Sequence, residues 1–449
     1  MIKKILIFTI IFISNSVLSQ NKKCNTTFLM NKLFEENERN ENLFHETAKK
    51  NNKWIDENIN KQKNIITIPI VVHVIHKNTH SNIGSGTNIS NEQIEDAIRI
   101  LNEDFSKTNP AFPNPPRNTF LNYAADVQIQ FCLANSDENG NPTSGVTRTP
   151  TTKNDFDPDS EANDMKQNST GGKDGWNPEK YLNIWVCNLA VSPSGGMTLG
   201  YAYLPGSLWG NQMWRDGLVV DFQYFGTIGA SAASNDGSTT THEIGHYLGL
   251  LHTFCEETDN NGNPTCCDND DVWWGGNIDD TPASEGIYWG SVNSSTNNNT
   301  CNDLSYSNVF NTNVLDMDEN FMSYSSDVWM FTNKQASVMN GTMNNYRSSL
   351  KNSPALVNCT GIVGNNNLLN NNHIRIYPNP TNGRILIQNL SNITIEKIIV
   401  RNVLGDVILL SNNVNLPFSL DLSNVENGIY FIEITSSKGK RIEKVILSQ

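Results

Sequence analysis

The sequence predicts an α+β protein in which a domain of strands and helices is followed by a small β-sandwich, and three observations indicate this. Apolar runs of strand length alternate with helical patterns between residue 65 and about residue 250. The chain then becomes irregular up to about residue 324, whereas the last 77 residues alternate short strand runs with turns. A length of 449 residues suits two or three domains.

The N-terminus predicts a secretory signal peptide over residues 1–19. Lys3 and Lys4 precede an apolar run over 5–13, and the small-residue pattern ends at Ser19. A buried N-terminal helix is the alternative. The run is too short to span a membrane, and no later run approaches 18 apolar residues, so we expect an exported chain whose mature form has no membrane span.

Residues 20–64 are polar and helix-prone, with scattered apolar anchors. Such a segment would not fold alone, so we interpret it as a pro-segment that lies against a larger domain. Cys24 stands alone near its start. A thiolate is a good zinc ligand, which makes Cys24 a candidate latency switch on a metal site. An incidental or disulfide-bonded cysteine is the alternative.

The next domain is predicted to begin with a buried strand over Ile65–Ile75. Ser90 then caps a helix, with Gln93 placed to close a capping box. Further strands are expected at 127–134, 182–189, 199–204 and 218–222, and a helix is expected at about 238–250. His73, His76 and His80 suggest a second metal site, but alternate histidines on a strand and its exit are more often ordinary polar side chains.

The stretch from His242 to His252 has the pattern H-E-x-x-H-x-x-G-x-x-H. On a helix, His242 and His246 project from one face and can bind one metal ion, while Gly249 lets the chain turn so that His252 supplies a third nitrogen. Glu243 lies beside the metal as a candidate catalytic base. A chance arrangement of helix residues is the alternative, but a pattern this long is rare. We therefore predict a Zn²⁺ site with an open fourth position.

Charge is distributed unevenly about this motif. The net charge is −14, and residues 216–333 hold 18 acidic residues with no Lys or Arg, so the remainder has 32 basic and 28 acidic residues. A solvated acidic face is the ordinary interpretation. Around a zinc helix we favour attraction of basic substrates and binding of Ca²⁺. Nucleic acid is not an expected partner.

Eight cysteines in an exported chain permit disulfides. Cys132 and Cys187 lie in two strand-like runs and could pair across a sheet. The connectivity of the cysteines that follow the zinc helix stays open; they are Cys255, Cys266, Cys267 and Cys301. No C-x-x-C pattern occurs, so a structural zinc cluster is not expected.

The remaining chain supplies a last helix and a separate domain. Helical character returns over Asn333–Leu350, residues 353–372 end in an Asn run and predict a linker, and residues 373–449 predict the β-sandwich.

Several stretches resemble the pappalysin family of metzincin metallopeptidases, in particular its ulilysin-like members. They are TIPIVVHVIH, LNIWVCNL, LGYAYLP, HEIGHYLGLLHTF, the Asp-Asp-Thr-Pro run at 279–282 and NFMSYSSD. The resemblance covers about residues 65–350 and implies a metzincin catalytic domain over 65–352. It implies a mixed twisted sheet with a backing helix, a zinc helix at the floor of a cleft, and an irregular lower subdomain.

The resemblance also assigns roles in this lower part. It implies that Met322 forms a tight turn under the zinc, that Tyr324 lies near the metal and stabilises the oxyanion, and that Asp327 selects Arg or Lys after the scissile bond. Possible calcium ligands lie in the loops after the zinc helix: Asp268, Asp270, Asp271, Asp279 and Asp280. The chain departs from the pattern because Asn25, not glycine, follows Cys24, and because the family's cysteine after the methionine turn is absent around Trp329.

The C-terminal region resembles the sorting domain of the type IX secretion route of Bacteroidetes. Its three recurrent blocks are YPNPTNG, VLG and NGIY. A carbohydrate-binding or adhesive sandwich is the alternative, but the segment offers no aromatic platform or metal cluster. The expected partner is the type IX machinery, with export through the outer membrane to the medium or the cell surface.

We therefore expect a secreted zinc endopeptidase of proteins and peptides, made as a latent zymogen, with Zn²⁺ and Ca²⁺ as cofactors. The alternatives are a non-catalytic metal-binding surface adhesin and a zinc hydrolase of small amides.

Overall fold

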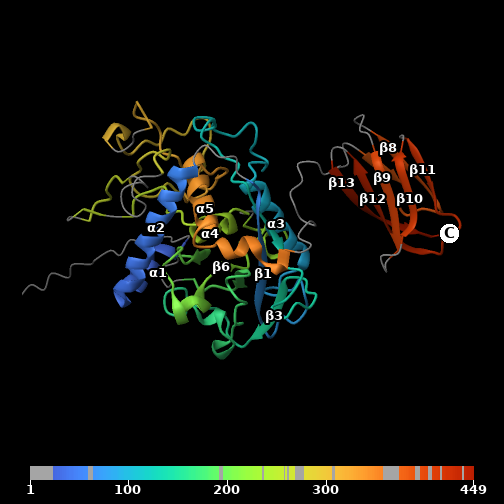
Figure 1. Cartoon of the computed structure of the whole chain (residues 1–449), viewed down its shortest axis with the longest axis horizontal. Coiled ribbons are helices and arrows are strands. Elements are labelled where there is room, and N and C mark those ends of the chain that lie inside the picture. Colours follow the sequence, from blue (N-terminus) through green and yellow to red (C-terminus); the bar gives the residue numbers. More distant parts are fainter. Residues whose placement is uncertain are drawn as a thin grey trace, which may run out of the picture.

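The computed structural model describes most of the chain (Figure 1). The described residues are 24–58, 64–191, 196–234, 237–256, 258–259, 262–267, 278–305, 309–356, 374–389, 395–402, 407–414, 417–436 and 439–448. The predicted signal peptide lies outside them. Within the described residues, no helix is long and apolar enough to cross a membrane.

The first domain is built on a mixed sheet, as predicted, and this sheet has six strands. Its order is β2-β1-β4-β6-β5, with β3 pairing β1, and only the pairing of β5 with β6 is antiparallel. The strands are β1 Ile66–Lys77, β2 Ile129–Leu133, β3 Val146–Thr151, β4 Leu182–Cys187, β5 Gly200–Ala202 and β6 Leu218–Asp221. Because β1 is covered on both faces, it is apolar along most of its length. β3 was not predicted, since VTRTPT has no apolar run.

In the part of the chain that the structure describes, five α-helices and several 3₁₀ turns accompany this sheet. The helices are α1 Thr26–Glu36, α2 Glu38–Asn58, α3 Asn91–Phe105, α4 Thr239–Tyr247 and α5 Asn333–Asn344. The 3₁₀ turns are η1 Asp164–Lys166, η2 Asn168–Thr170, η3 Gly210–Arg215, η4 Gly229–Ser231, η5 Asp303–Ser305, η6 Ser348–Asn352 and η7 Pro354–Leu356.

Helix α3 backs the sheet with the predicted apolar stripe, which is buried in the central core. Ser90 caps it as expected by accepting the Gln93 amide hydrogen. The second half of the predicted capping box is wrong: the Gln93 side chain instead donates to the Phe222 and Phe225 carbonyls and the Ser231 hydroxyl. Gln93 therefore fixes the chain that leads from β6 towards α4. Thr332 and Gln335 form a complete capping box on α5.

The predicted pro-segment consists of α1 and α2, which lie along the first domain (Figure 1). Leu29, Leu33 and Phe44 are buried in a cluster with side chains of β4, β5 and β6. Farther along α2, Ile55 reaches the central core, and the Asn51 amide donates to the Thr342 hydroxyl of α5. A segment too polar to fold alone is thus ordered by the larger domain.

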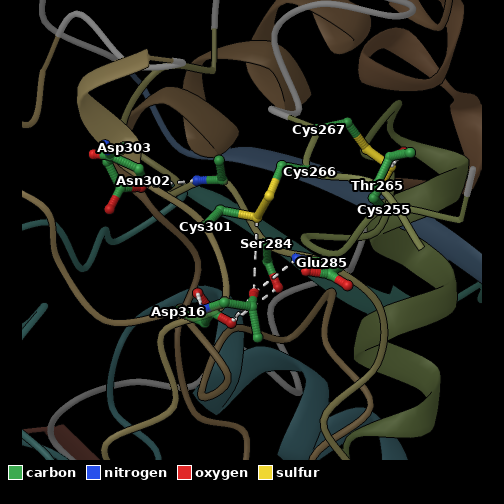
Figure 2. Close-up of a disulfide and its surroundings, with 12 residues drawn as sticks. Cys255, Thr265, Cys266, Cys267, Ser284, Glu285, Cys301, Asn302, Asp303 and Asp316 are labelled. Carbon is green, nitrogen blue, oxygen red and sulfur yellow. Dashed lines mark hydrogen bonds between the residues drawn. A yellow bond between two sulfur atoms is a disulfide. The ribbon is translucent and has the colours of Figure 1, made fainter. Parts of the chain in front are cut away.

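Disulfides and buried polar groups stabilise the irregular region that follows α4 in the sequence. Cys255 pairs with Cys267, and Cys266 pairs with Cys301 (Figure 2). The proposed pairing of Cys132 with Cys187 is wrong, because Cys187 is a buried free thiol on β4 while Cys132 is disulfide-bonded elsewhere. Strands β2 and β4 flank β1 on opposite sides, which separates these two cysteines.

The C-terminal domain is the predicted β-sandwich. A four-stranded sheet of order β10-β9-β12-β13 faces a three-stranded sheet of order β11-β8-β7. The strands are β7 Ile374–Tyr377, β8 Arg384–Asn389, β9 Ile395–Asn402, β10 Val407–Val414, β11 Phe418–Asp421, β12 Gly428–Ser436 and β13 Gly439–Leu447. Alternate apolar residues of both sheets form its core, including Ile387, Val400 and Ile432.

Between the two domains, the packed chain extends through η7, where Ala355 is buried against Val71 and Tyr181. The first four residues of the predicted linker, 353–356, therefore pack on the first domain. Residues 357–373 are not among the described residues.

Candidate metal centre

Three buried histidines converge on one point. His242 and His246 lie one turn apart on α4, and Gly249, with φ of 105°, reverses the chain so that His252 returns towards them. The Nε2 atom of His252 lies 3.2 Å from that of His242 and 3.1 Å from that of His246. Tetrahedral zinc, with Zn–N bonds of about 2.0–2.1 Å, holds its ligand nitrogens roughly 3.3 Å apart. The site therefore fits a zinc ion.

The outer nitrogens of these rings fix which nitrogen faces the metal. His242 Nδ1 donates to the Phe321 carbonyl at 2.7 Å, and His246 Nδ1 donates to the Leu250 carbonyl at 2.8 Å. Since a carbonyl can only accept, each of these two Nε2 atoms presents its lone pair to the point where a metal ion would bind. His252 differs, because its Nδ1 atom lies 3.3 Å from Oε2 of Glu256.

Met322 lies directly beneath the zinc helix. It belongs to a tight turn in which the Ser323 amide donates to the Asn320 carbonyl. A Cβ atom added to Gly245 of α4 would lie 2.4 Å from the Met322 sulfur. The helix can approach the methionine this closely because residue 245 is glycine.

Glu243 is buried beside the histidines. Burial raises the pKa of its carboxyl well above the usual value, although hydrogen bonds with Cys24 and Thr26 lower it in part. Gly200 on the edge strand β5 makes room for this side chain, since a Cβ there would lie 2.8 Å from Glu243 Cγ. The carboxyl is therefore held close to the metal position and ready to exchange a proton.

Cys24 reaches the same centre. One ligand atom from each of Cys24, His242, His246 and His252 lies within 4.8 Å of the others. The Cys24 thiol lies 3.5 Å from Glu243 Oε2, and the next amide, that of Asn25, donates to the Gly200 carbonyl. The residue that the sequence offered as a latch therefore completes a four-donor set.

Tyr324 closes the centre from below. Its hydroxyl accepts the Cys24 amide hydrogen at 3.1 Å, and its ring centroid lies 4.9 Å from that of His252. Burial raises the pKa of the Tyr324 phenol well above its usual value, so the hydroxyl keeps its proton. It is thus a hydrogen-bond donor at neutral pH.

A small cavity of about 30 Å³ adjoins the metal site. Its lining residues are Cys24, Leu199, Ser238, Thr239, His242, Glu243, Phe321, Ser323, Tyr324, Ser325 and Val328. Asp327 is not among them: its carboxylate accepts hydrogen bonds from the Ser291 hydroxyl and the Val292 amide. Sequence reasoning missed the apolar wall formed by Leu199 and Val328, because neither residue carries chemistry of its own.

The calcium candidates do not gather at one described point. Asp268, Asp270 and Asp271 lie outside the described residues. Asp280 accepts the Thr332 hydroxyl and the Lys334 amide, and burial raises its pKa to about 6. The neighbouring Asp279 faces the Lys334 ammonium at 3.4 Å.

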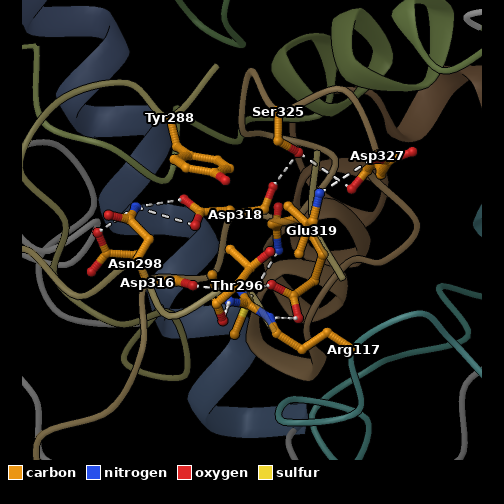
Figure 3. A network of polar contacts seen from close by, with 12 residues as sticks. Arg117, Tyr288, Thr296, Asn298, Asp316, Asp318, Glu319, Ser325 and Asp327 are labelled. Carbon is orange, nitrogen blue, oxygen red and sulfur yellow. Dashed lines mark hydrogen bonds and ion pairs between the residues drawn. The ribbon is translucent and has the colours of Figure 1, made fainter. Parts of the chain in front are cut away.

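A polar network near the cavity was not predicted (Figure 3). Arg117 pairs with Glu319 in the interior, and the Asn298 amide donates to both Asp316 and Asp318. The acidic run Asp316–Glu319 is the sequence feature that could have indicated this network. The residues that bond to it lie far away in the sequence.

Comparison with known proteins agrees with this geometry. A model of the peptidase family described as pregnancy-associated plasma protein-A matches residues 165–344, and a model of a secretion system C-terminal sorting domain matches residues 375–448. An extracellular metalloprotease of Pyricularia oryzae is 27% identical over 195 residues, which cover 43% of this chain and 53% of that protein. One from Arthroderma gypseum is 29% identical and covers 48% of this chain and 55% of that protein. The chain thus spans about half the length of these curated relatives.

Two solved structures from Tannerella forsythia are also similar. Mature mirolysin in complex with a cleaved peptide is 32% identical with a TM-score of 0.53, covering 65% of this chain and 97% of that chain. A promirolysin mutant is 29% identical with a TM-score of 0.55, covering 74% of this chain and 97% of that chain.

A zinc helix that ends at glycine, a third histidine beyond it and a methionine turn beneath it define the metzincin class. Within that class, the chain belongs to the pappalysin family, and it ends in a type IX secretion sorting domain.

Proposed function

We propose that the chain is a secreted zinc-dependent endopeptidase that is made in a latent form. The observation that carries this proposal is the convergence of three buried histidines beside a buried glutamate, at a small cavity that His242 and Glu243 line. A zinc ion supplies a Lewis acid here, which polarises a scissile carbonyl and acidifies water. The sorting domain supports export of the protein, and the peptide-bound mirolysin structure supports a peptide substrate.

Glu243 moves the protons of this reaction. It accepts a proton from the attacking water and delivers that proton to the leaving amine. One carboxylate serves both steps, because it takes up the proton as a base and returns it as the conjugate acid. Tyr324 donates a hydrogen bond to the oxygen that gains negative charge, once Cys24 no longer occupies its hydroxyl.

Latency rests on Cys24, which fills the position that water would need. The pro-segment carries this thiol and is anchored by the burial of Leu29, Leu33 and Phe44. The promirolysin structure covers 74% of this chain and the mature form covers 65%. The difference, 9% of 449 residues, is about 40 residues, which is close to the length of the segment 20–64.

The preference for Arg or Lys after the cleaved bond is assigned to Asp327. Asp327 lies between Ser325 and Val328 in the sequence, and both of these residues line the cavity. The absence of Lys and Arg from residues 216–333 adds a negative potential that favours basic substrates. We also assign Ca²⁺ to the loops after the zinc helix, with Asp279 as the described candidate; Asp280 already caps α5.

One observation favours a second candidate. With Cys24 the site has four protein donors, and structural zinc sites are closed in this way. A non-catalytic metal-binding adhesin would keep Cys24 in place permanently.

Cleavage-site mapping on a complex peptide mixture separates these functions. The full chain and its Cys24→Ala form are compared over time, and the activated Asp327→Ala form is compared with the activated wild type. We expect earlier cleavage by Cys24→Ala, cuts before Arg or Lys by the wild type, and loss of that preference in Asp327→Ala. Absence of cleavage by every zinc-loaded form would favour the adhesin, and an unchanged profile for Asp327→Ala would contradict the role of Asp327.

A further inference from the structure

The three zinc histidines are not supported alike. The outer nitrogens of His242 and His246 donate to backbone carbonyls, which the fold itself holds in place. The outer nitrogen of His252 faces a side chain, since its Nδ1 atom lies 3.3 Å from Oε2 of Glu256. Among the described residues, that buried nitrogen makes no well-aligned hydrogen bond, and its close polar contact is the Glu256 carboxylate.

His252 also lies outside the helix that carries the other two histidines. His242 and His246 belong to α4, whereas His252 follows the helix in an irregular stretch. Its ring is held by side chains: Phe254 stacks on it with ring planes 9° apart and centroids 4.7 Å apart, and Glu256 meets its outer edge. Phe254 and the Tyr324 ring, whose centroid lies 4.9 Å from that of His252, are apolar contacts that do not distinguish the two ring nitrogens. The carboxylate meets Nδ1 and thereby favours the tautomer in which Nε2 presents its lone pair.

The pro-segment binds the same carboxylate oxygen. Thr27, three residues after Cys24, donates its hydroxyl hydrogen to Oε2 of Glu256. The pro-segment thus contacts the metal centre at two points. The Cys24 thiol lies beside the three histidines, and Thr27 bonds to the carboxylate that faces Nδ1 of His252. The Glu256 side chain is 36% exposed in this state, so the loss of Thr27 leaves its carboxylate open to water and to His252.

We propose that Glu256 is a positioning residue that orients His252 as a zinc ligand, and that Thr27 uses this carboxylate as a second latch of the pro-segment. A carboxylate behind a metal-bound histidine fixes its tautomer and raises its basicity, and removal of such a group typically lowers metal affinity about 10–100-fold. The inference rests on the proposed zinc peptidase, but its first test measures metal binding and not turnover.

The first experiment measures zinc affinity by competition with a chelator on the full-length chain. The variants are Glu256→Ala and Glu256→Gln, with Glu285→Gln as the control because Glu285 is an exposed acid of the same region. We expect Glu256→Ala to bind zinc about 10–100-fold more weakly, Glu256→Gln to recover part of the loss, and Glu285→Gln to match the wild type. Circular dichroism verifies that each variant is folded.

Kinetics of the matured proteins then separate positioning from substrate binding. Glu256→Ala should lower kcat and leave KM within about twofold, since the residue acts through His252. Zinc affinity within twofold of the wild type, or a raised KM with unchanged kcat, would overturn the positioning role. Failure of the wild type to bind zinc would instead refute the proposed function.

The second latch is tested by Thr27→Val, which keeps the shape of the side chain and removes its hydroxyl. Thr47→Val is the matched control, because the hydrogen bond that the Thr47 hydroxyl makes to a described residue stays within α2, with the Leu43 carbonyl. A hydrogen bond to a charged group is worth about one to two orders of magnitude in an opening equilibrium. Thr27→Val should therefore mature about tenfold faster than Thr47→Val, with an unchanged zinc affinity after maturation. Equal maturation rates would overturn the second latch.

Discussion

The sheet region and the loop region of the first domain meet at the metal centre but are stabilised in different ways. The sheet region, formed by β1–β6 with α3 and α4, encloses a core of fully buried apolar side chains such as Ile98 and Val220. The loop region, residues 248–332, relies on two disulfides and on buried charged groups. The sheet region supplies His242, His246 and Glu243, and the loop region supplies His252, Met322 and Tyr324.

This difference suggests a division of roles. A close-packed apolar core makes the helix rigid and fixes two ligands at helical spacing. A region without regular structure places its side chains through crosslinks and polar pairs instead, and each of these can be removed singly. The loop region is thus the part in which one substitution can disturb the centre while the rest of the domain stays folded.

The largest expected effect comes from the ion pair of Arg117 with Glu319 (Figure 3). Glu319→Gln leaves the buried Arg117 charge without its partner, which should lower the free energy of unfolding by about 3–5 kcal/mol. The matched change in the sheet region is Ile98→Ala. It leaves a cavity in the core and should lower the free energy of unfolding by about 2–5 kcal/mol.

Urea unfolding measures both changes in the free energy of unfolding. The double variant Arg117→Met, Glu319→Leu should recover most of the stability that Glu319→Gln loses. A cost below 1 kcal/mol for Glu319→Gln would mean that the pair does not hold the loop region.

Replacing Cys255, Cys266, Cys267 and Cys301 with Ser removes both disulfides of the loop region and leaves the disulfide of Cys132 in place (Figure 2). This variant should be loosened more in the loop region than in the sheet region. Cys266–Cys301 closes the longer loop, with a sequence separation of 35, against 12 for Cys255–Cys267. Each crosslink is worth about 2–4 kcal/mol, and the longer loop should contribute more. Hydrogen exchange followed by mass spectrometry should show faster exchange over 248–332 in this variant than in the wild type. Equal acceleration in β1 and α3 would contradict this separation.

The smallest effect concerns pH and compares one buried aspartate from each region. Burial raises the pKa of Asp221 at the end of β6 to about 6, and burial with the nearby charge of Asp316 raises the pKa of Asp318 to about 7. A raised carboxyl pKa stabilises the folded state at low pH, and this contribution is lost as pH rises through the folded pKa. Relative to their Asn variants, both residues should therefore contribute less stability as pH rises from about 4 to 7.

The pH dependence of the difference in unfolding free energy between each variant and the wild type checks this. The stability advantage of the wild type over Asp221→Asn should decline at a lower pH than its advantage over Asp318→Asn. A difference independent of pH would show that neither carboxyl keeps its proton in the folded state.

The same division explains what the sequence could predict. The spacing of His242, His246 and Gly249 depends on local helix geometry, so the histidine ligands could be placed before the structure was known. The roles of Met322 and Tyr324 came only from the family resemblance, since nothing in their local sequence points to zinc. β3 was missed because its residues carry no strand pattern, although β1 pairs with it along six residues.

Contacts between distant segments could not be predicted. The pairing of Cys132 with Cys187 failed because apolar patterning identifies strands but not their order in a sheet. Arg117 and Glu319 are 202 positions apart, and Thr27 and Glu256 are 229 apart, so no periodicity links them. The orientation of Asp327 towards Ser291 depends on a loop that sequence reasoning left without structure.

The central claim is that this centre binds zinc and uses Glu243 as its proton carrier. The most direct measurement determines zinc content and peptide turnover together for the activated wild type and for Glu243→Ala. We predict one zinc ion per chain in both proteins and a kcat about 10²–10⁴-fold lower in the variant. Turnover by Glu243→Ala at the wild-type rate, or a wild type that cleaves peptides without zinc, would contradict the account.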